Sequence, residues 1–245
     1  LRWRYFWEHA PMYVVMIASE CAPVAKVGGL ADVVFGLSRE LEIRGHAVEI
    51  VLPKYDCMRD DQVWGLHVVD QELSVPWDGG AIQCAVWFGF AHGRKCYFIE
   101  PRSAQGYFER GTYYGFWDDP ERFAFFSKAA LEFLLKSHKR PDVIHTHDWQ
   151  TALVSVLLYE MYAAAGLAHQ RVCHTIHNFR HQGTTGPGIL QATGLNRPDY
   201  FGAPDRMGDE FDRHSINLMR GAILYSNVVT TVSPHHAWEA RHTDL

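Results

Sequence analysis

Apolar runs and helical periodicities alternate along most of this chain. Continuous apolar runs at 13–19 and 47–52 predict buried strands, and between them the apolar positions from Leu30 to Leu41 recur at helical spacing, with Gly45 ending the helix. Further strands are expected at 142–147, 171–177 and 228–232, and further helices after Pro120, at 151–165 and at 216–225. This alternation predicts an α/β fold with a Rossmann-like, mostly parallel sheet and helices on both faces.

The segment from 63 to 99 has a different pattern. Short alternating stretches surround Pro76, Asp78-Gly79-Gly80 and His92-Gly93, which predicts a β-hairpin or meander inserted at the edge of the sheet. The chain has no internal repeat, low-complexity tract or flexible linker. Residues 1–245 are therefore expected to form a single domain, with 1–12 as an extension.

A glycine pair stands where the first strand meets the first helix. Lys26, Gly28 and Gly29 precede Leu30, and glycines at a helix N-terminus let backbone N–H groups approach an anion while a lysine adds positive charge. The pattern therefore predicts a phosphate site. The alternative is a tight turn with a solvated Lys26. The segment matches neither G-x-G-x-x-G nor G-x-x-x-x-G-K-[ST], so neither a classical dinucleotide site nor a P-loop is indicated.

Polar residues follow the other predicted strands. Asp148 and Trp149 follow the strand at 142–147, and His177 and Asn178 follow the next one. Open α/β sheets bind ligands at the carboxyl ends of their strands, so these residues are expected to line one crevice. For His145 alone, a buried ring hydrogen-bonded to the backbone is the favoured interpretation. The set favours a neutral polar pocket for sugar hydroxyls, with stacking by aromatic side chains drawn from Trp149, Tyr113, Tyr114 and Trp117.

A metal site is an alternative interpretation of these histidines. His145-x-His147 followed by Asp148 contains ligand-type side chains, but Trp149 and Gln150 stand where a hydrolytic centre of the H-x-H-x-D-H kind needs Asp and His. A metal-dependent hydrolase therefore remains only a third alternative. The sequence predicts no metal site and no cofactor.

Composition limits the partners and the compartment. A net charge of −5 and a pI near 6.3 argue against nucleic acid or an acidic membrane as the main partner. Five cysteines without C-x-x-C spacing are typical of free thiols in a reducing compartment. No apolar run approaches the length of a membrane span. Because the chain begins at Leu1 and not at Met, it is expected to be a segment of a longer polypeptide.

Four motifs carry a resemblance that spans almost the whole chain. The segments KVGGLADVV at 26–34, PDVIHTHDW at 141–149, TIHNFRHQG at 175–183 and TTVSP at 230–234 resemble the ordered motifs of bacterial glycogen synthases and plant starch synthases. GTYYG and ERFAFF are also similar to that family. The order and spacing of the four motifs make the resemblance specific.

The resemblance implies a retaining glucosyltransferase of the GT-B type, with two facing Rossmann-like domains. Such an enzyme transfers glucose from ADP-glucose, or UDP-glucose, to the non-reducing end of an α-1,4-glucan such as glycogen, starch or a maltooligosaccharide. This chain is similar to the amino-terminal, acceptor-side domain, and the carboxy-terminal nucleotide-binding domain has no counterpart in it. The cytoplasm of a bacterium or the plastid stroma of a plant is the implied location.

Residue roles are carried over by the same resemblance. The resemblance implies His177 and Asp148 as catalytic residues; Lys26, Gly28 and Gly29 as contacts of the donor diphosphate; and Asn178, Tyr114, Trp149 and Gln182 as sugar-binding residues. Arg180-His181 departs from the family, in which an aromatic residue often precedes Gln-Gly. Without the second domain the chain is expected to transfer glucose very poorly, so a non-catalytic glucan-binding module is the main alternative.

Overall fold

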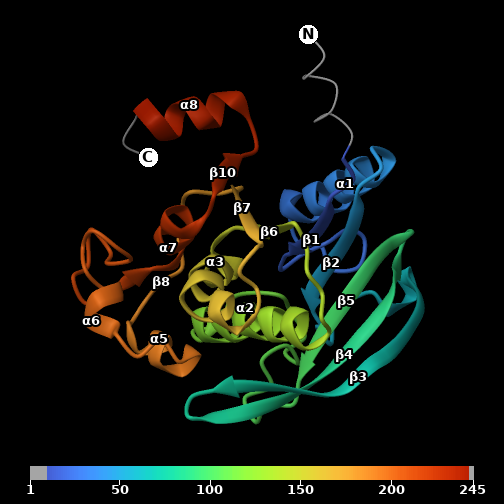
Figure 1. Ribbon diagram of the computed structural model, residues 1–245, viewed down its shortest axis with the longest axis horizontal. Coiled ribbons are helices and arrows are strands. Elements are labelled where there is room, and N and C mark those ends of the chain that lie inside the picture. Colours follow the sequence, from blue (N-terminus) through green and yellow to red (C-terminus); the bar gives the residue numbers. More distant parts are fainter. Residues whose placement is uncertain (1–9, 243–245) are drawn as a thin grey trace.

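The computed structural model describes residues 10–242, so most of the extension expected at 1–12 lies outside the described residues. Eight strands form one sheet in the order β10-β7-β6-β1-β2-β5-β4-β3 (Figure 1). Their bounds are β1 (Tyr13–Ile17), β2 (Ala47–Pro53), β3 (Val63–Trp77), β4 (Gly80–Ala91), β5 (Arg94–Pro101), β6 (Val143–His147), β7 (Arg171–Ile176) and β10 (Val228–Thr231).

The six strands from β10 to β5 run parallel, as the apolar runs predict. In β1, Val14 pairs with Val48 of β2 on one side and with Val143 of β6 on the other. Four of the five residues of β1, and four of the five residues of β6, are buried. Strands covered on both faces read as continuous apolar runs, which is why β1 could be predicted from the sequence; β6 is equally buried although its last three residues are His, Thr and His.

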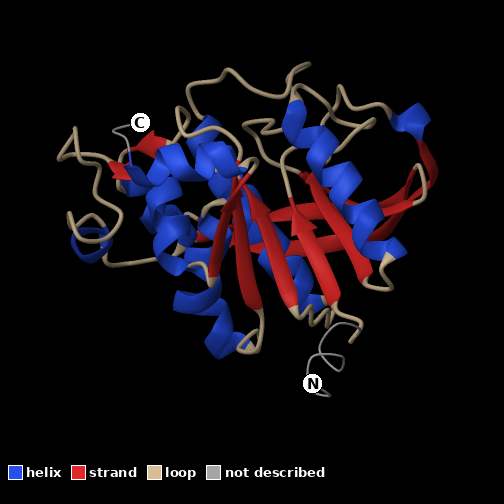
Figure 2. Cartoon of the chain, turned by 90° about the horizontal axis from the view of Figure 1, so that it is seen from above, coloured by secondary structure: helices blue, strands red, loops and turns tan. Residues whose placement is uncertain are grey.

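Helices cover both faces of the sheet, as Figure 2 shows. The chain moves from β1 to β2 in one direction, and from β5 through β6 and β7 to β10 in the other. Because parallel crossovers are right-handed, this reversal puts the helix after β1 opposite the helices that follow β5, β6 and β7. The helices are α1 (Gly29–Ile43), α2 (Asp119–Lys136), α3 (Leu153–Leu157), α4 (Ala163–Ala165), α5 (Gly188–Thr193), α6 (Pro198–Phe201), α7 (Leu218–Tyr225) and α8 (Pro234–His242).

The meander predicted at 63–99 is confirmed at the sheet edge. β3 and β4 form an antiparallel hairpin whose turn is at Asp78-Gly79, and β4 pairs antiparallel with β5. β5 in turn pairs parallel with β2, so the meander continues the main sheet. Helix α2 lies against β3, β5, α3 and α5. It is consequently buried from Arg122 to Leu134 and forms the centre of the core.

Some predicted boundaries are wrong. The helix expected from Ile216 starts at Leu218, because Ile216 and Asn217 form β9 (Ile216–Asn217), which pairs with β8 (Thr184–Thr185). Asn217 then caps the helix by accepting a hydrogen bond from the Arg220 backbone N–H. The helix expected at 151–165 is also irregular, since a π-helical turn at Leu158–Tyr162 separates α3 from α4.

Candidate active site

A cavity of about 770 Å³ opens at the carboxyl ends of β1 and β6. β1 and β6 are the neighbouring strands from which the chain departs in opposite directions, and such a switch point leaves a crevice between the two departing loops. The predicted convergence is confirmed, because residues that follow four strands line this one cavity. They are Glu20, Gly28, Gly29, Asp148, Trp149, His177, Asn178 and Val232, together with Tyr114 from the loop before α2.

The loop before α1 is held by a carboxylate. Glu20 is 5% exposed, and its Oε2 accepts hydrogen bonds from the backbone N–H groups of Val27 (2.7 Å) and Gly28 (2.9 Å). Its Oε1 accepts a hydrogen bond from the Tyr114 hydroxyl at 2.8 Å. Burial raises the pKa of Tyr114 well above its ordinary value, so this hydroxyl stays protonated and can donate. Glu20 therefore joins the glycine loop to the tyrosine across the cavity wall.

Asp148 stands in a strained position directly after β6. Its φ of 54° and ψ of −177° belong to a region that non-glycine residues rarely adopt, and such strain is concentrated at functional sites. Its Oδ1 accepts hydrogen bonds from the backbone N–H groups of His177 (2.6 Å) and Asn178 (3.4 Å). Burial raises the pKa of Asp148 to about 6, although those two N–H groups oppose the shift. The carboxylate thus fixes the backbone that follows β7.

A cluster of four histidines lies on and after β6 and β7, and one of them, His177, lines the cavity. His147 is fully buried, its Nδ1 lies 3.1 Å from His177 Nε2, and its ring packs on His145 with a centroid distance of 4.2 Å. Burial lowers the pKa of His145 to about 4 and that of His174 to about 3, and it also lowers those of His147 and His177. The cluster is neutral at pH 7. In the contact between His147 and His177, one neutral ring therefore donates an N–H and the other ring accepts it.

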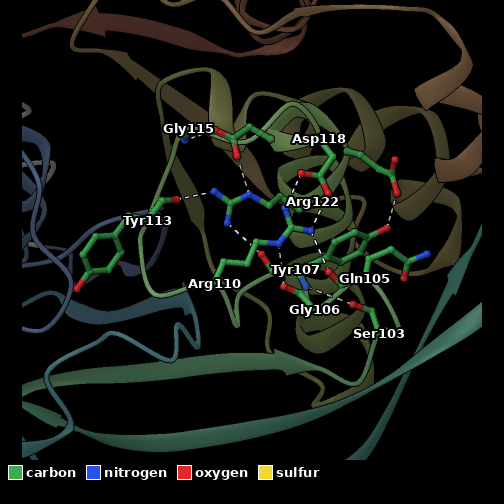
Figure 3. A network of polar contacts seen from close by, with 11 residues as sticks. Ser103, Gln105, Gly106, Tyr107, Arg110, Tyr113, Gly115, Asp118 and Arg122 are labelled. Atoms are coloured by element: carbon green, nitrogen blue, oxygen red, sulfur yellow. Dashed lines mark hydrogen bonds and ion pairs between the residues drawn. The ribbon is translucent and has the colours of Figure 1, made fainter.

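The loop that carries Tyr114 is anchored by a buried arginine. Arg122 is fully buried and donates to Asp119 Oδ1 at 2.8 Å and to the backbone carbonyls of Tyr107 and Tyr113, as Figure 3 shows. The other oxygen of Asp119 accepts the Gly115 N–H at 2.9 Å. Because a buried charge is costly unless it is paired and hydrogen-bonded, this network holds the backbone on both sides of Tyr114 in one conformation.

Several of the residues singled out in the sequence, among them Tyr113, lie outside the cavity lining. Lys26 is exposed and forms an ion pair with Asp32 at 2.7 Å, which agrees with the solvated alternative. Gln182 donates to the Phe179 carbonyl and contacts Asn217, so its amide joins the loop after β7 to α7. Of the aromatics, Trp149 and Tyr114 line the cavity, whereas Trp117 is 91% exposed and lies outside it.

Sequence reasoning missed three charged or titratable cavity residues. Glu20 lies three residues after the end of β1, and Asp119 is the first residue of α2. His181 was noted only as a departure from the family pattern. The lining contains Glu20, Asp119 and Asp148 but, within residues 10–242, no lysine or arginine. The cavity wall formed by this part of the chain is therefore anionic.

Between residues 10 and 242, no group of three or more His, Cys, Asp or Glu side chains could hold a metal ion. Within the same range, no helix has the length and apolar character that a membrane crossing requires.

Comparison with known proteins agrees with the geometry. The family model described as starch synthase catalytic domain matches residues 13–244. Probable glycogen synthase 2 of Synechocystis sp. is 63% identical over 96% of this chain and 48% of its own length. Glycogen synthase 1 of Synechococcus sp. is 66% identical over 94% of this chain and 47% of its own length.

A solved structure shows the same fold. The catalytic domain of starch synthase IV from Arabidopsis thaliana, bound to ADP and acarbose, matches with a TM-score of 0.92 and 49% identity, over 95% of this chain and 47% of that one. This chain thus spans about half the length of the curated glycogen synthases it matches. By sequence and by fold, the chain belongs to the starch synthase catalytic domain family, within the GT-B architecture.

Proposed function

We propose that this chain is the amino-terminal, acceptor-side domain of a glucosyltransferase that transfers glucose from ADP-glucose, or UDP-glucose, to the non-reducing end of an α-1,4-glucan. One observation carries the proposal: the family's motif residues, far apart in sequence, line a single cavity at the switch point of the sheet. The structural relative bound to ADP and acarbose, a nucleotide and an oligosaccharide analogue, supports the same pair of ligands.

The proposed sugar contacts come from the ends of β6 and β7. The N–H bonds to the Asp148 carboxylate are both made at Oδ1, which leaves Oδ2 to accept a hydrogen bond from a sugar hydroxyl. Asn178 and His177 offer further polar groups from the same wall, with His177 nearest the anomeric carbon. Trp149 presents an apolar face against which a pyranose ring can pack. Gln182 supports this wall from behind through its contact with Asn217.

The proposed diphosphate contacts come from the loop before α1. Gly28 and Gly29 line the cavity, so their backbone N–H groups are the donors for phosphate oxygens. Lys26 belongs to the same loop and would add its charge after leaving Asp32. Loss of a nucleoside diphosphate develops negative charge, and positioned cations are usually the largest source of catalytic stabilisation. The anionic lining described above supplies none, so efficient transfer requires the half of the relatives that this chain does not match.

A chimera tests this function directly. The chain is fused to the remaining half of the Synechocystis relative, and transfer of labelled glucose from ADP-glucose to glycogen is measured. The chimera is expected to incorporate glucose, and His177→Ala is expected to abolish the incorporation, whereas His169→Ala, at an exposed position, leaves it unchanged. A chimera that folds and binds ADP but incorporates nothing would contradict the proposal.

The second candidate function is a glucan-binding module without catalysis. The absence of lysine and arginine from the described cavity lining favours it for the isolated chain. Such a module binds maltohexaose without any nucleotide, and the isolated chain transfers no glucose. Comparing maltohexaose binding with and without ADP separates the two. For either function we propose a bacterial cytoplasm or a plastid stroma as the location, which is supported by relatives described as a bacterial glycogen synthase and as a chloroplastic or amyloplastic starch synthase.

A further inference from the structure

The donors that a phosphate would use are already occupied. Glu20 Oε2 lies 2.7 Å from the Val27 nitrogen and 2.9 Å from the Gly28 nitrogen. Successive backbone N–H groups that converge on one oxygen form the concave arrangement that binds anions in phosphate loops. In this chain the bound anion is a side chain of the protein. The Gly29 N–H group and the first turn of α1 lie next to it along the same loop.

The same carboxylate holds a second group. Glu20 Oε1 accepts the Tyr114 hydroxyl at 2.8 Å, so one side chain restrains both the glycine loop and the tyrosine. Glu20 also acts at longer range. Its negative charge raises the pKa of Asp148, secondarily to burial, and opposes the burial that lowers the pKa of His177. A substitution at Glu20 is therefore expected to change the hydrogen bonds of the glycine loop and the pKa values of Asp148 and His177.

We propose that Glu20 is an internal anion that occupies the Val27 and Gly28 N–H pair until the diphosphate of the donor displaces it. This displacement leaves the Tyr114 hydroxyl, which also lies 2.9 Å from Ser19 Oγ, without its carboxylate partner at the edge of the sugar site. The inference rests on the proposed function for the identity of the diphosphate. Its consequence is selectivity. A free phosphate or pyrophosphate must compete with a carboxylate that is already bound to both N–H groups, and no lysine or arginine of the described lining offsets that competition. Glu20 is thus a positioning residue that couples the phosphate loop to Tyr114.

Glu20→Gln removes the negative charge of the side chain and keeps nearly the same side-chain size and shape. The glutamine oxygen can still accept the two N–H bonds, but as a neutral group it competes with an anion less well and no longer repels it. Calorimetric titration with pyrophosphate is expected to show an affinity about tenfold or more higher for Glu20→Gln than for the parent, falling with added salt. Maltohexaose, which is neutral, is expected to bind both proteins equally. Glu40→Gln, which removes an exposed carboxylate outside the cavity lining, is the matched control and is expected to change pyrophosphate affinity less than twofold.

The possible outcomes are distinct. An unchanged or lower pyrophosphate affinity in Glu20→Gln, or no detectable binding to either protein, overturns the inference. Failure of the parent to bind maltohexaose counts against the proposed function instead. If Glu20→Gln does not fold, the parent itself provides the test by NMR titration with pyrophosphate. The Val27 and Gly28 amide resonances must then shift, and shifts confined to other residues overturn the inference.

Discussion

Lowering the pH from 7 to 5 is expected to destabilise this protein through its buried histidines. An unfolded histidine has a pKa of about 6.5. In the folded protein burial holds the pKa of His145 at about 4 and that of His174 at about 3. Between these values and 6.5 the unfolded chain binds protons that the folded chain does not, so the free energy of unfolding falls as the pH falls.

The magnitude follows from those pKa values. Between pH 7 and pH 5 each of the two histidines lowers the free energy of unfolding by about 2 kcal/mol. Asp148 has the opposite effect. Its pKa is about 6 in the folded protein and lower in the unfolded chain, so between pH 7 and pH 5 the folded state binds a proton that the unfolded state does not. This raises the free energy of unfolding by about 1 kcal/mol. The net loss is about 3 kcal/mol, and the lowered pKa of His147 adds to it in the same direction.

Urea unfolding at pH 7 and pH 5, with the slope m checked at both, measures this loss. His174→Gln removes one of the titrating rings, so the difference between the two pH values is expected to shrink by about 2 kcal/mol, whatever the variant's stability at pH 7. The exposed His169 is the matched control, and His169→Gln is expected to keep the full difference. The reasoning is refuted if His174→Gln loses as much stability between pH 7 and pH 5 as the parent does.

Three further predictions concern the walls of the cavity. Arg122→Met leaves the Asp119 carboxylate buried without its cation and is expected to lower the free energy of unfolding by about 3–5 kcal/mol, measured by urea denaturation. Gly183→Ala is expected to cost about 1–3 kcal/mol in the same assay, because φ is 66° and a Cβ would lie 2.6 Å from the Trp149 ring. In calorimetry the parent's maltohexaose affinity is expected to fall as the pH drops through about 6, where Asp148 is protonated, and Asp148→Asn is expected to bind weakly at both pH 7 and pH 5.

Each of these predictions has a control within the chain. Arg39→Met removes an exposed arginine and is expected to change stability little. Gly186→Ala, in the loop that contains Gly183, places its Cβ in open space and is expected to be nearly neutral. An Arg122→Met protein as stable as Arg39→Met, or a Gly183→Ala protein as stable as Gly186→Ala, contradicts the packing argument. An Asp148→Asn protein that keeps the parent's pH dependence shows that another group controls sugar binding.

The convergence of the site could be predicted because it depends on strand order and direction alone. Once 13–19, 142–147 and 171–177 are identified as parallel strands, Asp148 and His177 must emerge at the same edge of the sheet. The strand at 13–19 is identified by a continuous apolar run because both of its faces are buried, whereas the strands at 142–147 and 171–177 contain histidines and threonines among their apolar residues. The predicted start of the helix at Ile216 was wrong because local hydrogen bonds override the apolar spacing there. Its apolar spacing continues through Asn217, but a cap and a short β-pairing with Thr184 compete with the helix there.

The contacts of individual side chains could not be predicted from strand order and hydrophobic pattern. Glu20 is seven residues from Val27 in sequence, and nothing in that spacing shows that the chain folds back so that its carboxylate meets the loop. Lys26 has the residue type and position of a phosphate ligand, yet its ammonium group lies on Asp32, one turn into α1. Such local choices depend on side-chain geometry after the chain has turned, which hydrophobic periodicity does not describe.

The division of charge in the cavity gives the proposed function a physical logic. Backbone N–H groups, a neutral histidine cluster and a tyrosine hydroxyl provide directional contacts. Within the described residues, Glu20 and Asp148 keep the lining anionic, since Asp119 is paired with Arg122. A surface of this kind can orient a neutral glucan, but it opposes a diphosphate unless cations arrive from elsewhere. Glu20 adds to this electrostatic repulsion, because its carboxylate already occupies the two N–H groups where phosphate would bind. Under the proposed function, donor binding would become favourable only when a cationic partner surface covers the cavity, and the same charges would disfavour transfer to water before that.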